Sequence, residues 1–220
     1  MGVGHAAVAI AASRAIPRLN AGWLVLASLL ADFLLGIFAL LGLERAHVPP
    51  EYPVRHYLTF TFPYSHGLMP LLAWALVLGG LVASGRRLDR KRAFAVVALV
   101  AFSHFFLDGM VHVVGLPLLG ENSPKVGLGL WAEMPLELGL ETIMAVVGVA
   151  IFWKVAAPSA LSRYGVAVFM LVFCAATWSP LFMTTPPDVD QLVVGWIASP
   201  LLLGAVVYGL DRRRAIIASS

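Results

Sequence analysis

The segment at residues 93–114, AFAVVALVAFSHFFLDGMVHVV, contains no Lys or Arg and only one carboxylate. An apolar run of about 20 residues is long enough to cross the hydrocarbon core of a bilayer as one α-helix. The segment therefore predicts a transmembrane helix. Its aspartate and two histidines need a separate explanation, because ionisable groups are costly inside a membrane.

The rest of the chain has the same character. Of its 220 residues, 60% are hydrophobic and 12% are charged, against about 45–50% and 25% in soluble domains. Comparable apolar segments occupy residues 20–43, 63–84, 131–153, 164–183 and 191–210. The sequence thus predicts an all-α polytopic membrane protein, a single membrane domain over residues 1–220. Six full transmembrane helices are expected, plus a short N-terminal helix.

The short apolar segment at residues 3–16 ends at Pro17. At 1.5 Å per residue it is only about 20 Å long, which predicts a short or tilted span or a re-entrant helix. A signal peptide is disfavoured, because no basic region precedes the segment and His5 lies within it.

The basic residues predict the orientation. Five of them lie in the loop 86–92, and the others near span ends are Arg14, Arg18, Lys154, Arg163, Arg212, Arg213 and Arg214. The loops 44–62, 115–130 and 184–190 are poorer in Lys and Arg, so the positive-inside rule places them outside. We expect a multi-pass plasma-membrane protein with a cytoplasmic C-terminus, and with its N-terminus outside if the short first helix crosses.

This distribution also narrows the partners. The basic pI near 9.3 is explained by the span ends, so membrane lipid rather than nucleic acid is the expected partner. Cys174 is the only cysteine, which excludes an internal disulfide and a cysteine-rich zinc site.

Several ionisable residues lie inside the predicted spans. Asp32 and His66 each interrupt an apolar run, and His104, Asp108 and His112 follow one another at i, i+4 and i+8. Four residues advance a helix by about 400°, so these last three share one face. Glu133, Glu137 and Glu141 repeat that spacing on the next span. Under the predicted topology Asp108, His112, His66 and the three glutamates reach the same outer half of the membrane, and Asp32 lies near mid-depth. This predicts a shared cavity in the outer half.

Imidazole and carboxylate groups are typical ligands of zinc and related divalent ions. Alternative interpretations differ from residue to residue. His112 is as compatible with a wet interfacial side chain, and Glu133 with a solvated acid at a helix N-terminus. His47 and His56 are expected to be ordinary surface residues. A buried His–Asp pair that only holds helices together remains an alternative for the rest.

At these residues the chain resembles a bacterial family of membrane-bound, metal-dependent hydrolases of the inner membrane. The family pattern has a Thr-His near the N-terminus, then Pro-Asp-x-Asp, Thr-His-Ser, Ser-His-x-x-x-Asp and Gly-Leu-Trp with a downstream Glu. The positions of this chain that match the pattern, in order, are Gly4-His5, Ala31-Asp32-Phe33-Leu34, Ser65-His66-Gly67, Ser103-His104 with Asp108, and Gly129-Leu130-Trp131 with Glu141. The resemblance covers residues 1–145, and residues 146–220 add further helices.

That family is similar in turn to zinc-dependent phospholipase C and single-strand nucleases, so the resemblance implies phosphoester hydrolysis. Two departures matter: Leu34 replaces the second aspartate, and Tyr64-Ser65-His66-Gly67 differs from the usual histidine motif. Fewer metals, another substrate or lost activity are all compatible with these changes.

Our hypothesis is a membrane-embedded, metal-dependent hydrolase that cleaves a phosphoester of a lipid or lipid-linked substrate near the outer leaflet. The expected cofactor is a divalent metal, zinc being the best fit. The expected ligands are His5, Asp32, His66, His104, Asp108 and Glu141, with Glu141 and Asp108 as the catalytic carboxylates and Glu141 as a ligand or general base. A transporter or channel that moves protons or metal ions is the rival. A third alternative is a non-catalytic subunit that uses the site only for structure.

Overall fold

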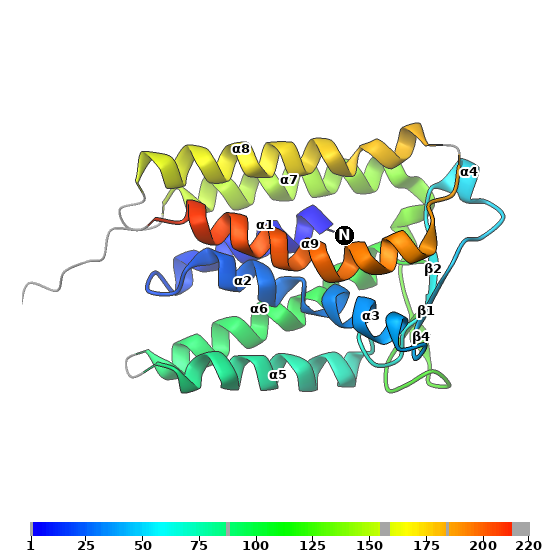
Figure 1. Ribbon diagram of the computed structural model, residues 1–220, viewed down its shortest axis with the longest axis horizontal. Coiled ribbons are helices and arrows are strands. Elements are labelled where there is room, and N and C mark those ends of the chain that lie inside the picture. Colours follow the sequence, from blue (N-terminus) through cyan, green and yellow to red (C-terminus); the bar gives the residue numbers. More distant parts are fainter. Residues whose placement is uncertain (1, 87–88, 155–158, 184, 213–220) are drawn as a thin grey trace, which may run out of the picture.

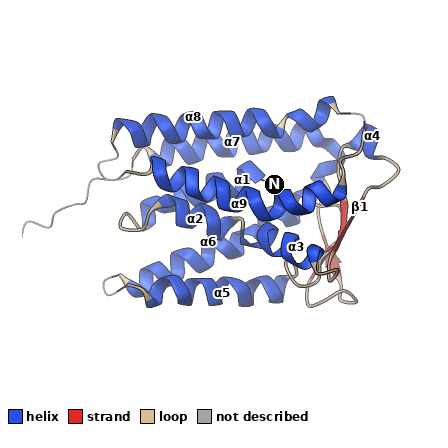
Figure 2. Cartoon of the chain, viewed as in Figure 1, coloured by secondary structure: helices blue, strands red, loops and turns tan. Residues whose placement is uncertain are grey.

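A computed structural model of the chain describes residues 2–86, 89–154, 159–183 and 185–212. The chain is mostly helical, and its helices run along one common axis (Figures 1 and 2). The described α-helices are α1 (Gly2–Ala12), α2 (Ala21–Ser28), α3 (Leu30–Leu40), α4 (Tyr52–Arg55), α5 (Leu68–Ser84), α6 (Arg90–Val111), α7 (Met134–Phe152), α8 (Ala160–Thr177) and α9 (Val189–Leu210). Short 3-10 helices are η1 (Ser13–Ala15), η2 (Leu130–Glu133) and η3 (Ser179–Phe182).

Four helical stretches are long and apolar enough to cross a membrane: Arg90–Val111, Leu130–Phe152, Ala160–Phe182 and Val189–Leu210. They correspond to four of the predicted spans. Large apolar side chains, among them Leu99, Val146, Leu171 and Leu202, are more than half exposed on them. Such surfaces are unusual for soluble proteins and fit lipid contact.

The prediction of six full spans is wrong, and the segment 20–43 is one reason. It forms two helices, α2 and α3, which meet at Leu29 with a bend of 50°. Counted as one span, this pair raises the number of candidate spans to five. Asp32 is consequently not in the middle of a helix but in the first turn of α3, where the helix dipole favours an acidic group.

The segment 63–84 is the second reason. Only its part from Leu68 onward is helical, because residues 63–67 form a turn before α5. The 17 residues of α5 are about 26 Å long, slightly less than the ~30 Å hydrocarbon core. His66 therefore lies in the turn rather than one turn into a helix.

The N-terminal helix α1 is enclosed by other helices. It begins near the middle of the bundle and runs toward the end that carries the α5–α6 connection (Figure 1). A Cβ on Gly148 of α7 would lie 2.7 Å from the Ala7 carbonyl oxygen, so the missing side chain lets the two helices approach closely. With 11 residues, about 16 Å, α1 is too short to cross the membrane.

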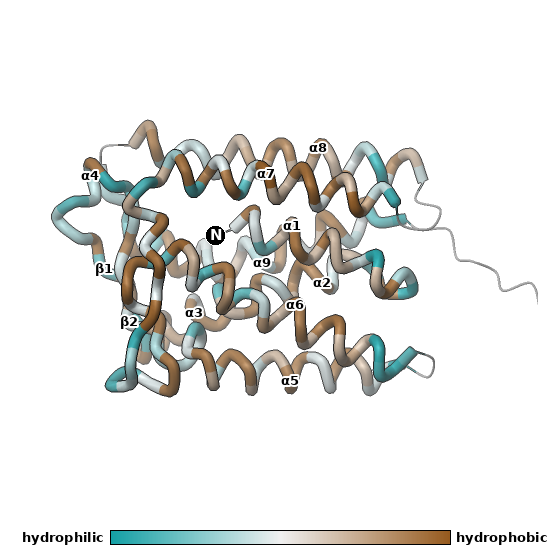
Figure 3. Tube along the Cα trace, turned by 180° about the vertical axis from the view of Figure 1, so that it is seen from behind, coloured by the Kyte–Doolittle hydropathy of each residue, from teal (hydrophilic) through white to brown (hydrophobic). Residues whose placement is uncertain are grey.

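Hydrophilic residues gather at the two ends of the bundle, and hydrophobic residues line the helices between them (Figure 3). One end contains two antiparallel strand pairs that the sequence did not predict. β1 (Arg45–His47) pairs with β2 (Thr59–Thr61), and β3 (Leu116–Pro117) pairs with β4 (Lys125–Val126). We call this end the strand end.

The opposite end is the basic end. There the Arg86 guanidinium donates to the Arg18 carbonyl oxygen, 3.4 Å away, and the Asn20 side chain donates to the carbonyl oxygen of Asp211. The α1–α2 connection, the last residues of α5 and α7 and the first residues of α6 and α8 all lie at this end (Figure 1). Residues 213–214, also predicted to be basic and cytoplasmic, lie outside the described residues.

The separation of the two ends predicts the orientation in the membrane. In a Cys174→Ala background, a cysteine replacing Asn122 at the strand end should react with a membrane-impermeant maleimide in intact cells. A cysteine replacing Ser84 at the basic end should react only after permeabilisation, since Lys and Arg favour the cytoplasmic side. Labelling with the opposite pattern would place the strand end inside the cell.

Candidate metal centre

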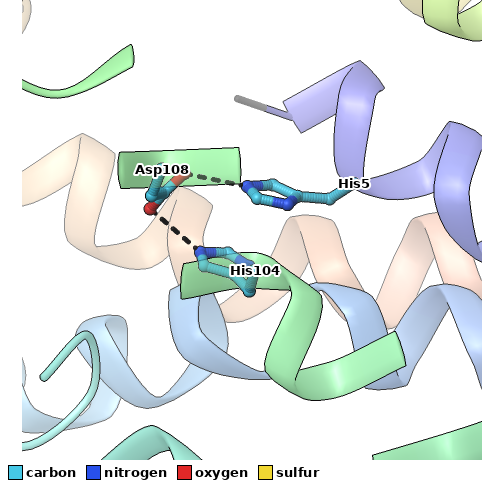
Figure 4. A group of neighbouring side chains, drawn as sticks. All are labelled: His5, His104 and Asp108. Atoms are coloured by element: carbon cyan, nitrogen blue, oxygen red, sulfur yellow. Dashed lines mark hydrogen bonds and ion pairs between the residues drawn. The ribbon is translucent and has the colours of Figure 1, made fainter. Parts of the chain in front are cut away.

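Five residues from four parts of the chain converge in the interior of the bundle. His5 comes from α1, Asp32 from the start of α3, His66 from the turn before α5, and His104 and Asp108 from α6. Figure 4 shows the rings of His5 and His104 stacked on each other, each with a nitrogen directed at a different oxygen of the Asp108 carboxylate. The spacing of four residues on α6 puts His104 and Asp108 on one helical face, as the sequence predicted.

Asp108 lies at the centre of the cluster. Its Oδ1 is 3.0 Å from His5 Nε2, and its Oδ2 is 3.2 Å from His104 Nε2, 3.3 Å from His112 Nε2 and 3.5 Å from His66 Nε2. Asp108 is only 2% exposed and His104 is fully buried. A buried carboxylate is stable only with positive or hydrogen-bonding partners, and here four imidazoles supply the surroundings.

The break between α2 and α3 orients His104. Its Nδ1 lies 2.7 Å from the carbonyl oxygen of Ser28. A carbonyl oxygen only accepts hydrogen bonds, so Nδ1 carries the proton and donates it. In the neutral ring, Nε2 then has a lone pair.

A chain of hydrogen bonds orients His66 in the same way. The Ser65 hydroxyl donates to Glu44 Oε2 at 2.6 Å and lies 2.7 Å from His66 Nδ1. Because a hydroxyl has one proton to donate, Ser65 Oγ accepts the proton of Nδ1. His66 Nε2 is thereby left with a lone pair.

These two lone pairs face each other. His66 Nε2 and His104 Nε2 are 3.2 Å apart, and Asp32 Oδ1 lies 3.8 Å from His66 Nε2. Two such lone pairs repel each other and the nearby Asp108 carboxylate unless positive charge lies between them, either an extra proton on one ring or a metal ion. Two nitrogens bound to one tetrahedral ion at about 2.0–2.1 Å would be about 3.3 Å apart, so the spacing fits a shared metal ion.

Two ligand groups can be defined, His5 with His104 and Asp108, and Asp32 with His66 and His104. Within each group, ligand atoms lie within 4.8 Å of one another. His104 belongs to both groups, which makes them one continuous centre. His5 Nδ1 has no hydrogen-bond partner among the described residues, so in the neutral ring Nε2 carries the proton and donates it to Asp108 Oδ1, 3.0 Å away. Nε2 would act as a ligand only when a metal ion replaces that proton.

A cavity of about 270 Å³ adjoins the centre. Asp32, His66, Asp108 and His112 contribute its polar wall. Its apolar wall includes Phe60, Phe62, Trp131, Trp196 and Leu203. The cavity therefore brings one polar surface of imidazoles and carboxylates against an otherwise hydrophobic space, as ligand sites commonly do.

Glu141, predicted as a ligand or base, does not belong to either ligand group. It is buried on α7, and its Oε2 accepts a hydrogen bond from the Val3 amide at 3.0 Å. That amide is among the first N–H groups of α1, which lack partners within the helix. Glu141 thus ties α7 to the start of the helix that carries His5, and its catalytic role stays a prediction.

The sequence did not predict the part that three residues play in the candidate metal centre. His112 was weighed as a wet interfacial residue but is only 6% exposed and contacts Asp108; its i+4 spacing from Asp108 was the available signal. Glu44 lies at the start of the predicted outer loop 44–62 and received no role there, but it is 1% exposed. Ser28 acts through its backbone, which no side-chain pattern reveals.

Glu133, His47 and His56 lie outside the centre. Glu133 is exposed, as expected, and pairs with Arg55 at 3.6 Å. His47 is exposed too, whereas His56 is half-buried and its Nδ1 is enclosed. The expectation of an ordinary surface residue is therefore wrong for His56.

Comparisons with protein-family models, with curated proteins and with solved structures gave no match. The resemblance of residues 1–145 to a hydrolase family stays a prediction. The candidate metal centre is defined by the contacts within this chain.

The geometry predicts that His104→Ala and Asp108→Ala each reduce bound divalent metal to near background, because both side chains serve the same centre. Metal in the purified protein can be measured by mass spectrometry after removal of loosely bound ions. His47→Ala, which changes an exposed ring outside the centre, should keep the wild-type metal content. Full occupancy in both α6 variants would exclude this helix as a ligand source.

The hydrogen bonds around His66 predict a weaker effect for Glu44→Ala. Loss of a group that orients a ligand typically lowers metal affinity about 10–100-fold. Titration with Co²⁺, followed by its visible absorption, measures that affinity directly. Glu51→Ala removes an exposed acid from the same connection and should bind Co²⁺ like the wild type, and equal affinity for Glu44→Ala would contradict the proposed orienting role.

Proposed function

We propose that this chain is a membrane-embedded, metal-dependent hydrolase that cleaves a phosphoester of a lipid or lipid-linked substrate near the outer leaflet. The observation that carries the proposal is the pair of facing nitrogens, His66 Nε2 and His104 Nε2, 3.2 Å apart beside a cavity. Protein sites that bind metal in this way and keep an open side are typical of catalysis.

The donor set favours zinc. Imidazole nitrogens with one or two carboxylates suit zinc better than Mg²⁺ or Ca²⁺, which prefer oxygen ligands. A zinc ion held here would act as a Lewis acid toward a phosphoryl oxygen and would make water a better nucleophile.

The residues of the chain divide the remaining work. Asp108 is enclosed by imidazoles and holds them together. The Asp32 side chain is 27% exposed and its contact with His66 is longer, 3.8 Å. Because Asp32 lines the cavity, it is the carboxylate best placed to accept a proton from an attacking water.

The substrate class is inferred from the setting. The cavity is bordered by Phe60 of β2 and Trp131 of η2, so it lies toward the strand end, which the positive-inside rule places outside. Apolar helix surfaces surround the bundle, which gives lipids access from the side. The predicted resemblance of residues 1–145 to membrane-bound metal-dependent hydrolases, a family similar in turn to phospholipase C, would imply the same chemistry.

An ion transporter or channel is the second candidate. The break between α2 and α3 favours it, because interrupted helices line ion sites in many transporters. However, Ile10, Leu24 and Val97 belong to a fully buried apolar core formed by α1, α2 and α6. An ion moving from the centre to the basic end would have to pass such side chains, so hydrolysis is the better-supported function.

Hydrolysis can be tested with zinc-loaded protein in lipid nanodiscs and a panel of phospholipids, lipid phosphates and a simple phosphodiester. We expect cleavage by the wild type and a loss of at least about 100-fold in His66→Ala, in line with removal of a ligand needed for electrostatic stabilisation. His47→Ala should remain active. Wild-type protein that holds its metal but cleaves none of the panel would contradict the proposal, and metal flux into vesicles would then favour transport.

A further inference from the structure

A second cavity, also about 270 Å³, lies beside the first. Gly2, Phe60, Trp131 and Trp196 line both cavities. The second cavity contains none of the metal-centre ligands. Its ionisable walls are instead Glu137, Glu141 and His56.

One oxygen of the buried Glu137 carboxyl group has no partner among the described residues. It is 2% exposed, and among the described residues its Oε1 has no hydrogen-bond donor. Its carboxyl group interacts with that of Glu141, which already accepts the Val3 amide. A hydrogen bond between two carboxyl groups requires one shared proton, which leaves one negative charge on the pair. That charge and the unpaired Oε1 favour a ligand with positive charge and N–H donors.

The remaining walls indicate what kind of cation fits. Tyr57, Phe60, Trp131 and Trp196 surround the space with aromatic rings, and no Lys or Arg is among the described lining residues. Aromatic faces attract ammonium groups. A metal ion is a poorer fit, because the ligand groups of three found in the described chain lie in the first cavity and include neither glutamate.

We propose that this cavity binds a primary ammonium group of the substrate. The inference rests on the proposed function. The metal centre beside the first cavity would bind the phosphoryl group, and the two cavities have lining residues in common. The substrate is then a zwitterionic phosphoester with an amine close to the phosphate, as in an aminoethyl phosphoester. A primary ammonium is preferred over a quaternary one because only the former can donate a hydrogen bond to Glu137 Oε1.

Binding can be measured without catalysis. Trp131 and Trp196 line the cavity, so the intrinsic fluorescence of zinc-loaded protein should change as ethanolamine phosphate is added. We expect choline phosphate to bind at least about tenfold more weakly, the effect of losing a hydrogen bond to a charged group. This comparison uses the wild-type chain alone, and equal affinity for the two compounds would overturn the proposal.

Glu137→Gln provides the matched variant, because it keeps the shape of the side chain and removes its charge. It should lose at least about tenfold in affinity for ethanolamine phosphate, whereas Glu133→Gln, at an exposed acid four residues earlier, should not. Unchanged affinity of Glu137→Gln would show a structural, protonated Glu137 and overturn the proposal. Metal content of each variant verifies that the centre is intact.

The test separates this site from the proposed hydrolysis. Charge-dependent binding of ethanolamine phosphate without any cleavage would support the ammonium site and contradict only the hydrolase. Cleavage of lipids without discrimination between ethanolamine and choline head groups would support the hydrolase and contradict the ammonium site. Nanodiscs containing phosphatidylethanolamine, compared with the soluble compound, show whether the ammonium comes from a lipid or from a free amine.

Discussion

The hydrogen bond between His104 and the Ser28 carbonyl oxygen organises the centre. In a continuous helix that oxygen would accept from the amide four residues later, but the bend at Leu29 leaves it for His104 Nδ1. The bond fixes the ring so that Nε2 faces His66 and Asp108. The same bend places Asp32 at the start of α3, where a carboxylate is stabilised by the free amides of the first turn. One interruption in an apolar segment therefore provides both a ligand orientation and a ligand position.

Around this bond, neighbouring segments contribute carboxyl groups whose burial would cost free energy without hydrogen-bond partners. Glu44 is buried because two backbone amides and the Ser65 hydroxyl satisfy its oxygens. Glu141 is buried beside the first amides of α1 and connects that helix to α7. These acids act on the centre through other residues, and a site held by such contacts keeps its geometry while an adjoining cavity stays open.

The sequence predicted what depends on local pattern. Hydropathy located the four long helices, and the spacing of His104 and Asp108 predicted their shared face. It failed where tertiary contacts decide the structure: the bend at Leu29 and the turn around His66 are not visible in an apolar run. Glu44 and His56 were misjudged because their burial depends on how the loops at the strand end fold over the bundle. Strand pairs of two or three residues are likewise too short to leave a periodic signal.

The central claim is that His66 and His104 bind one metal ion through their Nε2 atoms. X-ray absorption spectroscopy of zinc-loaded protein tests it most directly, because imidazole ligands give a recognisable scattering pattern. The account predicts at least two imidazole nitrogens at about 2.0–2.1 Å, and fewer imidazoles in the His104→Ala protein. A zinc environment of oxygen ligands alone, unchanged in that variant, would contradict it.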